Sequence, residues 1–396
     1  MKVLITCPPM INMIKNYDTL FKKFNLDYFC PKFSQTLTID ELVNLVPNYD
    51  GWIIGDDPAV RKVFEAGKQG KLKAAIKWGV GVDNVDFEAC KELNIPITNI
   101  PNVFGEEVSD VAIGLLLNLT RKLHDIDKET KKGNWFKPAG NSLTGKKACL
   151  IGFGDIGRST ARKLLAFNLN VYVSDPGFEK INGKIICKYN KDIIVPNILQ
   201  DVNITNLDDA LSESDFIVIT CALNKFTKHL INKENILKSK KGVKIINVAR
   251  GGIVNEVDLA EAVTAGNIAG AAIDVFENEP VTESPLFSLP QIVVTPHLGA
   301  STTEAQDKAG ESIAEQIELA LLGEFVPHAV NVAATEAAET VRPFLPLAEQ
   351  LGAIFSGLSN ALPEIVEIEF AGEIGGYDNK ITELSVVKGL LTTVSD

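Results

Sequence analysis

The stretch from Lys146 to Asp175 constrains the fold of this chain more than any other. It consists of an apolar run, the turn sequence GFGDIG, a segment with helical spacing of apolar residues, and a second apolar run that ends at Asp175. Strand, glycine turn, helix, strand and acidic residue in this order are typical of a dinucleotide-binding βαβ unit. A glycine motif alone also occurs in ordinary turns, so the prediction depends on the elements that flank it.

Each glycine of this motif has its own expected task. Gly152 allows the tight turn out of the strand, Gly154 lets the backbone approach a pyrophosphate, and Gly157 lets the helix pack closely on the strand. The helix N-terminus offers unpaired N–H groups to the phosphates. Asp175 lies 18 residues beyond Gly157, close to the spacing of about 20 expected for an acid that binds the ribose hydroxyls. Because this carboxylate would repel a 2′-phosphate, the sequence predicts NAD rather than NADP.

Charge and composition limit the partners of the chain. The 396 residues carry a formal net charge of −12, which argues against nucleic acid or an anionic membrane as the main partner. No apolar run reaches the roughly 20 residues that span a bilayer, and the first six residues are typical of a strand rather than a signal peptide. The six cysteines show no CxxC spacing, so we expect a cytoplasmic protein with reduced thiols and no metal site.

Apolar runs alternate with helical patterns along most of the chain, which predicts an α/β fold with doubly wound parallel sheets. The candidate strands of the first part are residues 3–6, 52–54, 74–77 and 95–99. Those of the second part are residues 148–151, 171–173, 216–220, 243–248, 271–275 and 292–295. Long helices are predicted over 106–131 and 302–322, each carrying the chain from one domain to the other.

Two other regions differ in character from this framework. Residues 181–206 are polar and lysine-rich and predict a surface excursion without an assigned function. Residues 329–396 predict a separate module, with helices at 344–358 and 381–391 and a strand at 365–370. Thirty of the 33 lysines and all six cysteines precede Val248. A join between two parent sequences near residues 247–250 is one hypothesis for this shift, although domains of one protein can also differ in this way.

Three residues at the ends of successive predicted strands are candidates for chemistry: Arg250, Glu279 and His297. Such positions face the ligand crevice of an open α/β sheet, although each residue alone is also consistent with a structural or surface role. Together they meet the needs of 2-hydroxy acid oxidation, which are a cation for the carboxylate, a base for the hydroxyl proton and an acid that orients the base. The remaining histidines are expected in surface or linker positions: His124, His229 and His328.

Five segments resemble the D-2-hydroxyacid dehydrogenase family in order and spacing: GVGVDNVD, GFGDIG, NVARGGIV, AAIDVFENEP and TPHLGAST. The later segments FLPLAEQLG and VEIEFAGEI are similar to the long, multi-domain D-3-phosphoglycerate dehydrogenases of that family. The resemblance implies a flavodoxin-like substrate domain over 1–101, completed by 298–328, and a Rossmann NAD domain over 102–297. It also implies a partial α+β regulatory or intervening module over 329–396, and a homodimer or homotetramer.

The resemblance also assigns roles to individual positions. Arg250 is expected to orient the substrate carboxylate, while Glu279 pairs with the acid/base His297. Further substrate-binding positions are Lys77, Val80, Gly81 and Asn102. The cofactor-binding positions are Gly152, Gly154, Asp155, Ile156, Gly157, Asp175, Ala249 and Asp274. The implied reaction is NAD-dependent oxidation of 3-phosphoglycerate to 3-phosphohydroxypyruvate in serine biosynthesis.

The chain departs from the phosphoglycerate dehydrogenase pattern near the predicted substrate. Lys77 stands where an arginine is frequent and lacks its planar fork for phosphate. Asp56 and Asp57 stand where a small hydroxyl residue is common. These differences favour an alternative substrate such as glyoxylate, hydroxypyruvate or another 2-oxo acid. An alternative of another class is an NAD-sensing binding protein without turnover, similar to corepressor relatives of the family.

Overall fold

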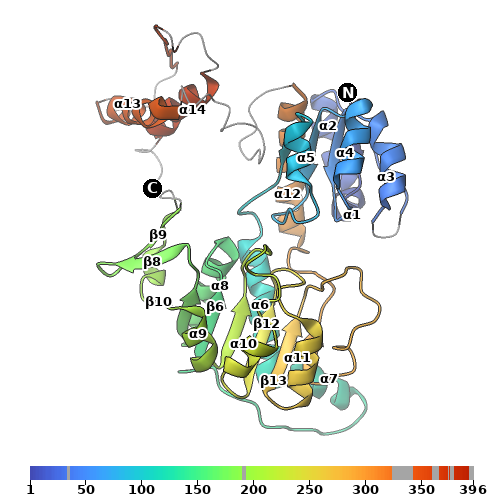
Figure 1. Ribbon diagram of the computed structural model, residues 1–396, viewed down its shortest axis with the longest axis vertical. Coiled ribbons are helices and arrows are strands. Elements are labelled where there is room, and N and C mark those ends of the chain that lie inside the picture. Colours follow the sequence, from blue (N-terminus) through green and yellow to red (C-terminus); the bar gives the residue numbers. More distant parts are fainter. Residues whose placement is uncertain are drawn as a thin grey trace. The chain divides into compact units, whose positions relative to one another are not determined.

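Two all-parallel sheets form the framework of the protein, and they belong to different compact units (Figure 1). The computed structural model describes residues 1–33, 36–189, 193–322, 342–358, 365–372, 374 and 379–391. The first unit comprises Met1–Trp78, Asn84–Asn99 and Ser312–Asp396, and the second comprises Gly79–Asp83 and Ile100–Glu311. The predicted domain boundaries at residues 101, 297 and 328 stay a prediction.

The sheet of the first unit has five strands in the order β2-β1-β3-β4-β5. This is the flavodoxin-like order of doubly wound folds, as predicted. Its strands are β1 (Lys2–Ile5), β2 (Asp27–Phe29), β3 (Gly51–Ile54), β4 (Ala74–Lys77) and β5 (Ile97–Thr98). Every residue of β3 and β4 is buried, as expected for parallel strands covered on both faces. The helices are α1 (Pro8–Asn12), α2 (Ile14–Lys23), α3 (Ile39–Leu45), α4 (Arg61–Gln69) and α5 (Phe87–Glu92).

The C-terminal half of α12 (Thr303–Leu322) packs on this first sheet. Ile317 Cδ1 lies 3.1 Å from the point that a Cβ on Gly51 of β3 would occupy, so the absence of a side chain there makes room for the helix. Buried Thr98 of β5 donates a hydrogen bond of 2.8 Å to Oε1 of Gln316. Gln316 and Ile317 thus lie on the face that joins α12 to the first unit.

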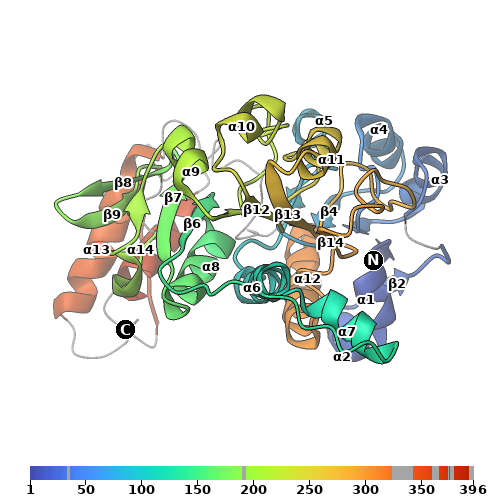
Figure 2. The same ribbon diagram turned by 90° about the horizontal axis from the view of Figure 1, so that it is seen from below.

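The sheet of the second unit has seven strands in the order β10-β7-β6-β11-β12-β13-β14. They are β6 (Lys147–Ile151), β7 (Asn170–Ser174), β10 (Asn203–Ile204), β11 (Phe216–Ile219), β12 (Val243–Asn247), β13 (Ile268–Ile273) and β14 (Ile292–Val294). Figure 2 labels β7, β6, β12, β13 and β14 of this sheet. Numbered within the unit, the order is the Rossmann order 3-2-1-4-5-6 with one further strand. The strand order reverses between β6 and β11, which is where ligands bind in such sheets.

The helices of the second unit follow the predicted alternation. They are α6 (Gly105–Arg121), α7 (Leu123–Lys131), α8 (Asp155–Ala166), α9 (Leu207–Glu213), α10 (Lys233–Lys238) and α11 (Glu256–Thr264). The single helix predicted over 106–131 is in fact two helices, because Lys122 has a φ of +55° and a left-handed residue ends the helical hydrogen-bond pattern. α6 packs beside α8 (Figure 2).

Residues 181–206 hold more regular structure than their polar composition predicted. β8 (Phe178–Ile181) and β9 (Lys184–Cys187) form an antiparallel hairpin. Its turn is Asn182-Gly183, with φ values of +51° and +80°. An Asn-Gly turn between alternating apolar residues is a strong hairpin signal, so this element was readable from the sequence.

Two other predictions need comment. Residues 365–370 form no strand, so that prediction is wrong. A strand needs a hydrogen-bonded partner, and none pairs with this segment in the part of the chain that the structure describes. His328 lies outside the described residues. Within those same described ranges, no helix combines the length and the apolar character needed to cross a membrane.

The predicted C-terminal helices are present as α13 (Leu345–Leu358) and α14 (Lys380–Leu391), which pack against each other. Two glycines permit this close packing. A Cβ on Gly352 would lie 2.0 Å from the carbonyl oxygen of Val386, and a Cβ on Gly389 would lie 1.9 Å from that of Glu349. The two helix backbones therefore approach each other directly at these positions.

Gly352→Ala is expected to weaken the packing of α13 on α14, because the added methyl group has no space beside Val386. Hydrogen–deuterium exchange of the peptide spanning residues 380–391 should become faster. Gly357→Ala is the matched control, since nothing lies within 4 Å of its Cβ position. Equal protection of that peptide in both variants would contradict the packing described.

Candidate active site

The glycine loop after β6 has the backbone geometry that a phosphate-binding turn requires. Gly152 has a φ of +101°, and a Cβ on it would lie 2.6 Å from the backbone nitrogen of Cys221. A Cβ on Gly157 would lie 2.3 Å from the carbonyl oxygen of Gly152, so this glycine lets α8 approach the strand end. Nothing lies within 4 Å of the Cβ position of exposed Gly154. Open space therefore remains before the N-terminus of α8, where N–H groups can hold a phosphate.

Asp175, at the end of β7, has a fixed carboxylate. Oδ2 accepts a hydrogen bond of 2.7 Å from the Phe153 backbone N–H, and Oδ1 accepts one of 2.7 Å from Gly177. The acid is therefore held against the glycine loop, and its predicted contact with the ribose stays a prediction. Burial and, to a lesser extent, the charge of Asp175 raise the pKa of the Cys221 thiol to about 11. Cys221 thus lies beside the same loop as a neutral thiol at physiological pH.

A buried asparagine shapes the turn that carries Arg250. Asn247, the last residue of β12, accepts a hydrogen bond of 3.1 Å from the Ala249 N–H and donates one of 2.9 Å to the Arg250 carbonyl oxygen. Because both sides of the turn are tied to one buried side chain, the Arg250 backbone is constrained. Sequence reasoning missed Asn247, although its place at a buried strand end was a usable signal.

The guanidinium of Arg250 is held from two sides. Nε donates to Oδ1 of Asp83 at 2.9 Å, and Nη1 donates to the Ala249 carbonyl oxygen at 2.7 Å. Nη2 lies only 1.3 Å from the point that a Cβ on Gly81 would occupy, so a side chain at position 81 would displace the guanidinium from this place. Gly81 is thus brought to Arg250. The sequence had identified the motif GVGVDNVD but not the role of its first aspartate.

Glu279 and His297 form a direct pair. His297 Nδ1 lies 2.6 Å from Oε2 of Glu279, and Oε1 of the same carboxylate accepts a hydrogen bond of 2.7 Å from the Phe276 N–H. His297 has a φ of +52°, an uncommon conformation for a residue that is not glycine. The backbone N–H of His297 donates a hydrogen bond of 2.7 Å to the Asp274 carbonyl oxygen. Both side chains are partly exposed, so the pair can reach a ligand.

Asp274 is buried, and the hydrogen bonds it makes organise the segment around His297. Oδ1 accepts hydrogen bonds from the Thr295 hydroxyl at 2.6 Å and from the Leu298 N–H at 3.0 Å, while Oδ2 accepts one from Gly299 at 3.1 Å. The observed contacts thus make Asp274 a support for the histidine loop. Its predicted contact with the cofactor stays a prediction.

Lys77, predicted to bind substrate, belongs to the first unit and is already paired there. It is 5% exposed, and its Nζ donates to Oδ1 of Asp56 at 3.1 Å and to the Trp78 carbonyl oxygen at 2.9 Å. Asp57 does not share that environment. It is fully buried and accepts hydrogen bonds from Leu37 and Gly55, and burial raises the pKa of its carboxyl. Asp57 therefore offers no exposed carboxylate beside Lys77, whereas the Asp56 side chain is largely exposed.

The remaining predicted positions are in the second unit, where their contacts with ligands stay predictions. Val80 and Asn102 are exposed, and Asn102 has a φ of +57°. Asp155 and Ile156 begin α8 and are half-buried. The other two described histidines, His124 and His229, are half-exposed. His124 Nδ1 lies 2.9 Å from Oδ1 of Asn118, and His229 Nε2 lies 3.3 Å from Oε1 of Glu277.

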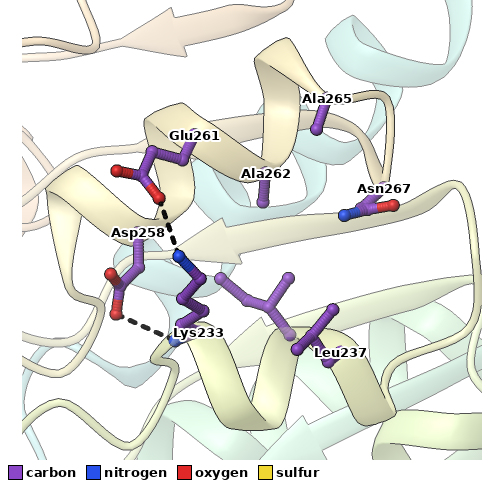
Figure 3. A pocket seen from close by; sticks show the side chains of 8 residues that line it. Lys233, Leu237, Asp258, Glu261, Ala262, Ala265 and Asn267 are labelled. Carbon is purple, nitrogen blue, oxygen red and sulfur yellow. Dashed lines mark hydrogen bonds and ion pairs between the residues drawn. The ribbon is translucent and has the colours of Figure 1, made fainter.

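A hollow of about 190 Å³ opens between α10 and α11 (Figure 3). Lys233 crosses its rim, with its backbone N–H 2.8 Å from Asp258 and its Nζ 3.3 Å from Glu261. In Figure 3 the Lys233 ammonium thus pairs with Glu261, while the Asp258 carboxylate accepts the Lys233 backbone N–H. None of the predicted catalytic or cofactor-binding residues lines this hollow, so it is separate from the candidate active site.

Two parts of the chain match known families. Residues 113–299 match the family described as D-isomer specific 2-hydroxyacid dehydrogenase, NAD binding domain. Residues 340–396 match the D-3-phosphoglycerate dehydrogenase intervening domain. Both matches confirm the resemblance that the sequence motifs predicted.

Individual relatives agree with these family matches. A D-3-phosphoglycerate dehydrogenase of Mycobacterium tuberculosis is 36% identical over 357 residues, which cover 90% of this chain and 65% of that protein. The chain thus spans less than two thirds of the length of that relative. A hydroxypyruvate reductase of Thermotoga maritima is 38% identical over 290 residues, covering 72% of this chain and 89% of that protein. The solved structure of an NAD-dependent formate dehydrogenase from Staphylococcus aureus in complex with NAD has a TM-score of 0.70 at 25% identity, covering 82% of this chain and 97% of that one.

Asp274→Asn is expected to destabilise the second unit, because an amide NH₂ would face N–H donors where an oxygen now accepts. Losing a hydrogen bond to a buried charged group should lower the free energy of unfolding by about 1.5–3 kcal/mol. Urea denaturation followed by circular dichroism measures the change. Glu283→Gln, an exposed substitution in the same segment between β13 and β14, is the control and should change stability by less than about 0.5 kcal/mol. Equal stability of the two variants would show that the Asp274 contacts are not needed.

Proposed function

The chain belongs to the D-isomer specific 2-hydroxyacid dehydrogenase family, and from that membership we propose that it is an NAD-dependent dehydrogenase of a D-2-hydroxy acid. The observation that carries the proposal is the Glu279–His297 pair at 2.6 Å in the same unit as the supported Arg250 guanidinium. A carboxylate-oriented base and a fixed cation are the groups that oxidation of a hydroxy acid needs.

The proposed reaction divides the work among these three residues. Arg250 binds the substrate carboxylate and so fixes the position of C2. Because Glu279 occupies Nδ1 of His297, Nε2 is the nitrogen assigned to take the hydroxyl proton. Oxidation of C2 to the carbonyl also releases a hydride, for which bound NAD would supply the acceptor, as NADH would supply the donor in the reverse direction. In the reverse direction protonated His297 returns the proton to the carbonyl oxygen.

The residues around the glycine loop fit an NAD molecule. The open space before Gly154 suits the pyrophosphate, and the fixed carboxylate of Asp175 suits the ribose hydroxyls. The family match of residues 113–299 is itself to an NAD-binding domain. Ile156 and Ala249 are proposed as further contacts.

Two substrate classes have separate support. The curated relatives named D-3-phosphoglycerate dehydrogenase and the intervening-domain match favour 3-phosphoglycerate and a place in serine biosynthesis. An unphosphorylated 2-oxo acid such as hydroxypyruvate or glyoxylate is favoured by the Lys77–Asp56 pair, since an anionic phosphate near that lysine would also meet the aspartate. The Thermotoga maritima relative named hydroxypyruvate reductase agrees with this second class.

The biological setting is part of the same proposal. We place the protein in the cytoplasm as a homodimer or homotetramer, with a small 2-hydroxy or 2-oxo acid as its partner and neither nucleic acid nor membrane. The free cysteines, buried or half-buried in the structure, agree with a reducing compartment. An NAD-sensing protein without turnover is the alternative of another class, and the Glu279–His297 pair weighs against it.

A turnover assay tests the enzyme proposal directly. NADH oxidation is measured with a panel that includes 3-phosphohydroxypyruvate, hydroxypyruvate and glyoxylate. His297→Ala should lower kcat by roughly 100-fold or more, the scale of general acid–base catalysis, while NAD binding is retained. His124→Ala, which removes a histidine outside the site, is the control. No turnover of any acid by the parent protein would leave the sensing alternative.

Arg250→Lys separates the carboxylate clamp from packing. Lysine keeps the charge but not the planar fork, so kcat/KM should fall about 10- to 100-fold, which corresponds to the loss of a charge-assisted hydrogen bond. The melting temperature and the affinity for NAD should stay near the parent values. An unchanged kcat/KM across the panel would remove Arg250 from the substrate site.

A further inference from the structure

The β8–β9 hairpin (Figure 1) begins three residues after Asp175. Immediately after β9, the Lys188 N–H donates a hydrogen bond of 2.8 Å to the Gly177 carbonyl oxygen. Gly177 is the residue whose own N–H donates to Asp175 Oδ1. Tyr189 follows Lys188, so the hairpin places it near the carboxyl end of β7, where Asp175 lies.

The ring of Tyr189 lies against Gly177. Its Cε2 and Cδ2 atoms are 3.2 and 3.3 Å from the point that a Cβ on Gly177 would occupy, and Oδ1 of Asp175 is 3.0 Å from the same point. The aromatic ring and the carboxylate are thus close neighbours, and the glycine makes room for both. Despite this contact Tyr189 is 79% exposed, so most of a large aromatic surface faces outward beside the acid.

We propose that Tyr189 is a cofactor-binding residue whose ring stacks on the adenine of NAD. This proposal rests on the proposed NAD site, because it takes Asp175 as the acid that binds the adenosine ribose. Adenine is attached to that same ribose, so it must lie within reach of the groups that flank the carboxylate. Nucleobases stack readily on exposed aromatic side chains, since every base has an apolar face.

A second apolar group lies near Asp175 and is available to contact the adenine. Cys221, two residues beyond β11, lies against Gly152 of the glycine loop, and its half-buried, neutral thiol makes it an apolar neighbour. A planar ligand anchored at Asp175 would thus have both the loop after β11 and the hairpin as neighbours. The hairpin thereby gains a role that its lysine-rich sequence did not suggest.

Binding of ADP-ribose tests the proposal without turnover. ADP-ribose carries the adenosine and pyrophosphate of NAD but no nicotinamide, and its dissociation constant can be measured by isothermal titration calorimetry. Tyr189→Ala should weaken binding about 10-fold, whereas Tyr189→Phe, which keeps the ring, should stay within about 2-fold of the parent. Trp135→Ala is the matched control, because it removes another exposed aromatic residue (81% exposed) from the same unit.

A fluorescent variant reports the stacking itself. In Tyr189→Trp, addition of ADP-ribose should quench the added tryptophan emission, with the parent protein as reference. The proposal is supported if Tyr189→Ala binds ADP-ribose more weakly while Tyr189→Phe and Trp135→Ala do not, and if this quenching is observed. If the parent binds ADP-ribose and Tyr189→Ala binds it equally well, the role of Tyr189 is overturned and the proposed function stands. If the parent binds neither ADP-ribose nor NAD, both are overturned.

Discussion

A ladder of backbone hydrogen bonds that continues past the ends of three parallel strands holds the candidate site together. At the ends of β12, β13 and β14, the Asp274 backbone N–H donates to the Asn247 carbonyl oxygen at 3.0 Å, and the His297 backbone N–H donates to the Asp274 carbonyl oxygen at 2.7 Å. Because parallel strands present their carboxyl ends at the same edge, this ladder places the three loops side by side.

Buried polar side chains complete what the backbone begins. Asn247 and Asp274 are each 1% exposed, and each is used as a hydrogen-bonding centre for the loop that follows its strand. A satisfied buried polar network specifies one arrangement, whereas an unsatisfied group would be costly. Arg250 and His297 therefore lie on loops whose backbones are held by hydrogen bonds to these buried side chains. Their partners Asp83 and Glu279 orient the Arg250 and His297 side chains themselves.

In the first unit, the charged residues Lys77, Asp56 and Asp57 differ in how they are paired and buried. Lys77 is buried and paired with Asp56, while Asp57 is buried among backbone N–H donors. The two adjacent acids have opposite relations to solvent, since the Asp56 side chain is largely exposed. A residue-by-residue resemblance would treat Lys77 as a cation available to a phosphate, but the structure shows it already engaged.

The sequence by itself determined the two parallel α/β sheets, the glycine loop, Asp175 and the family. These depend on apolar periodicity and on motifs confined to a few neighbouring residues, which local sequence records directly. The Asn182-Gly183 turn of the hairpin is local information of the same kind. Only the tertiary structure decided that Asp83 orients Arg250 across 167 residues, that Gly81 makes room for the guanidinium, and that Tyr189 lies beside Gly177. Each of these contacts depends on which loops the sheet register and the hairpin bring together. A local sequence pattern does not specify which residues far apart in the chain will lie close in space.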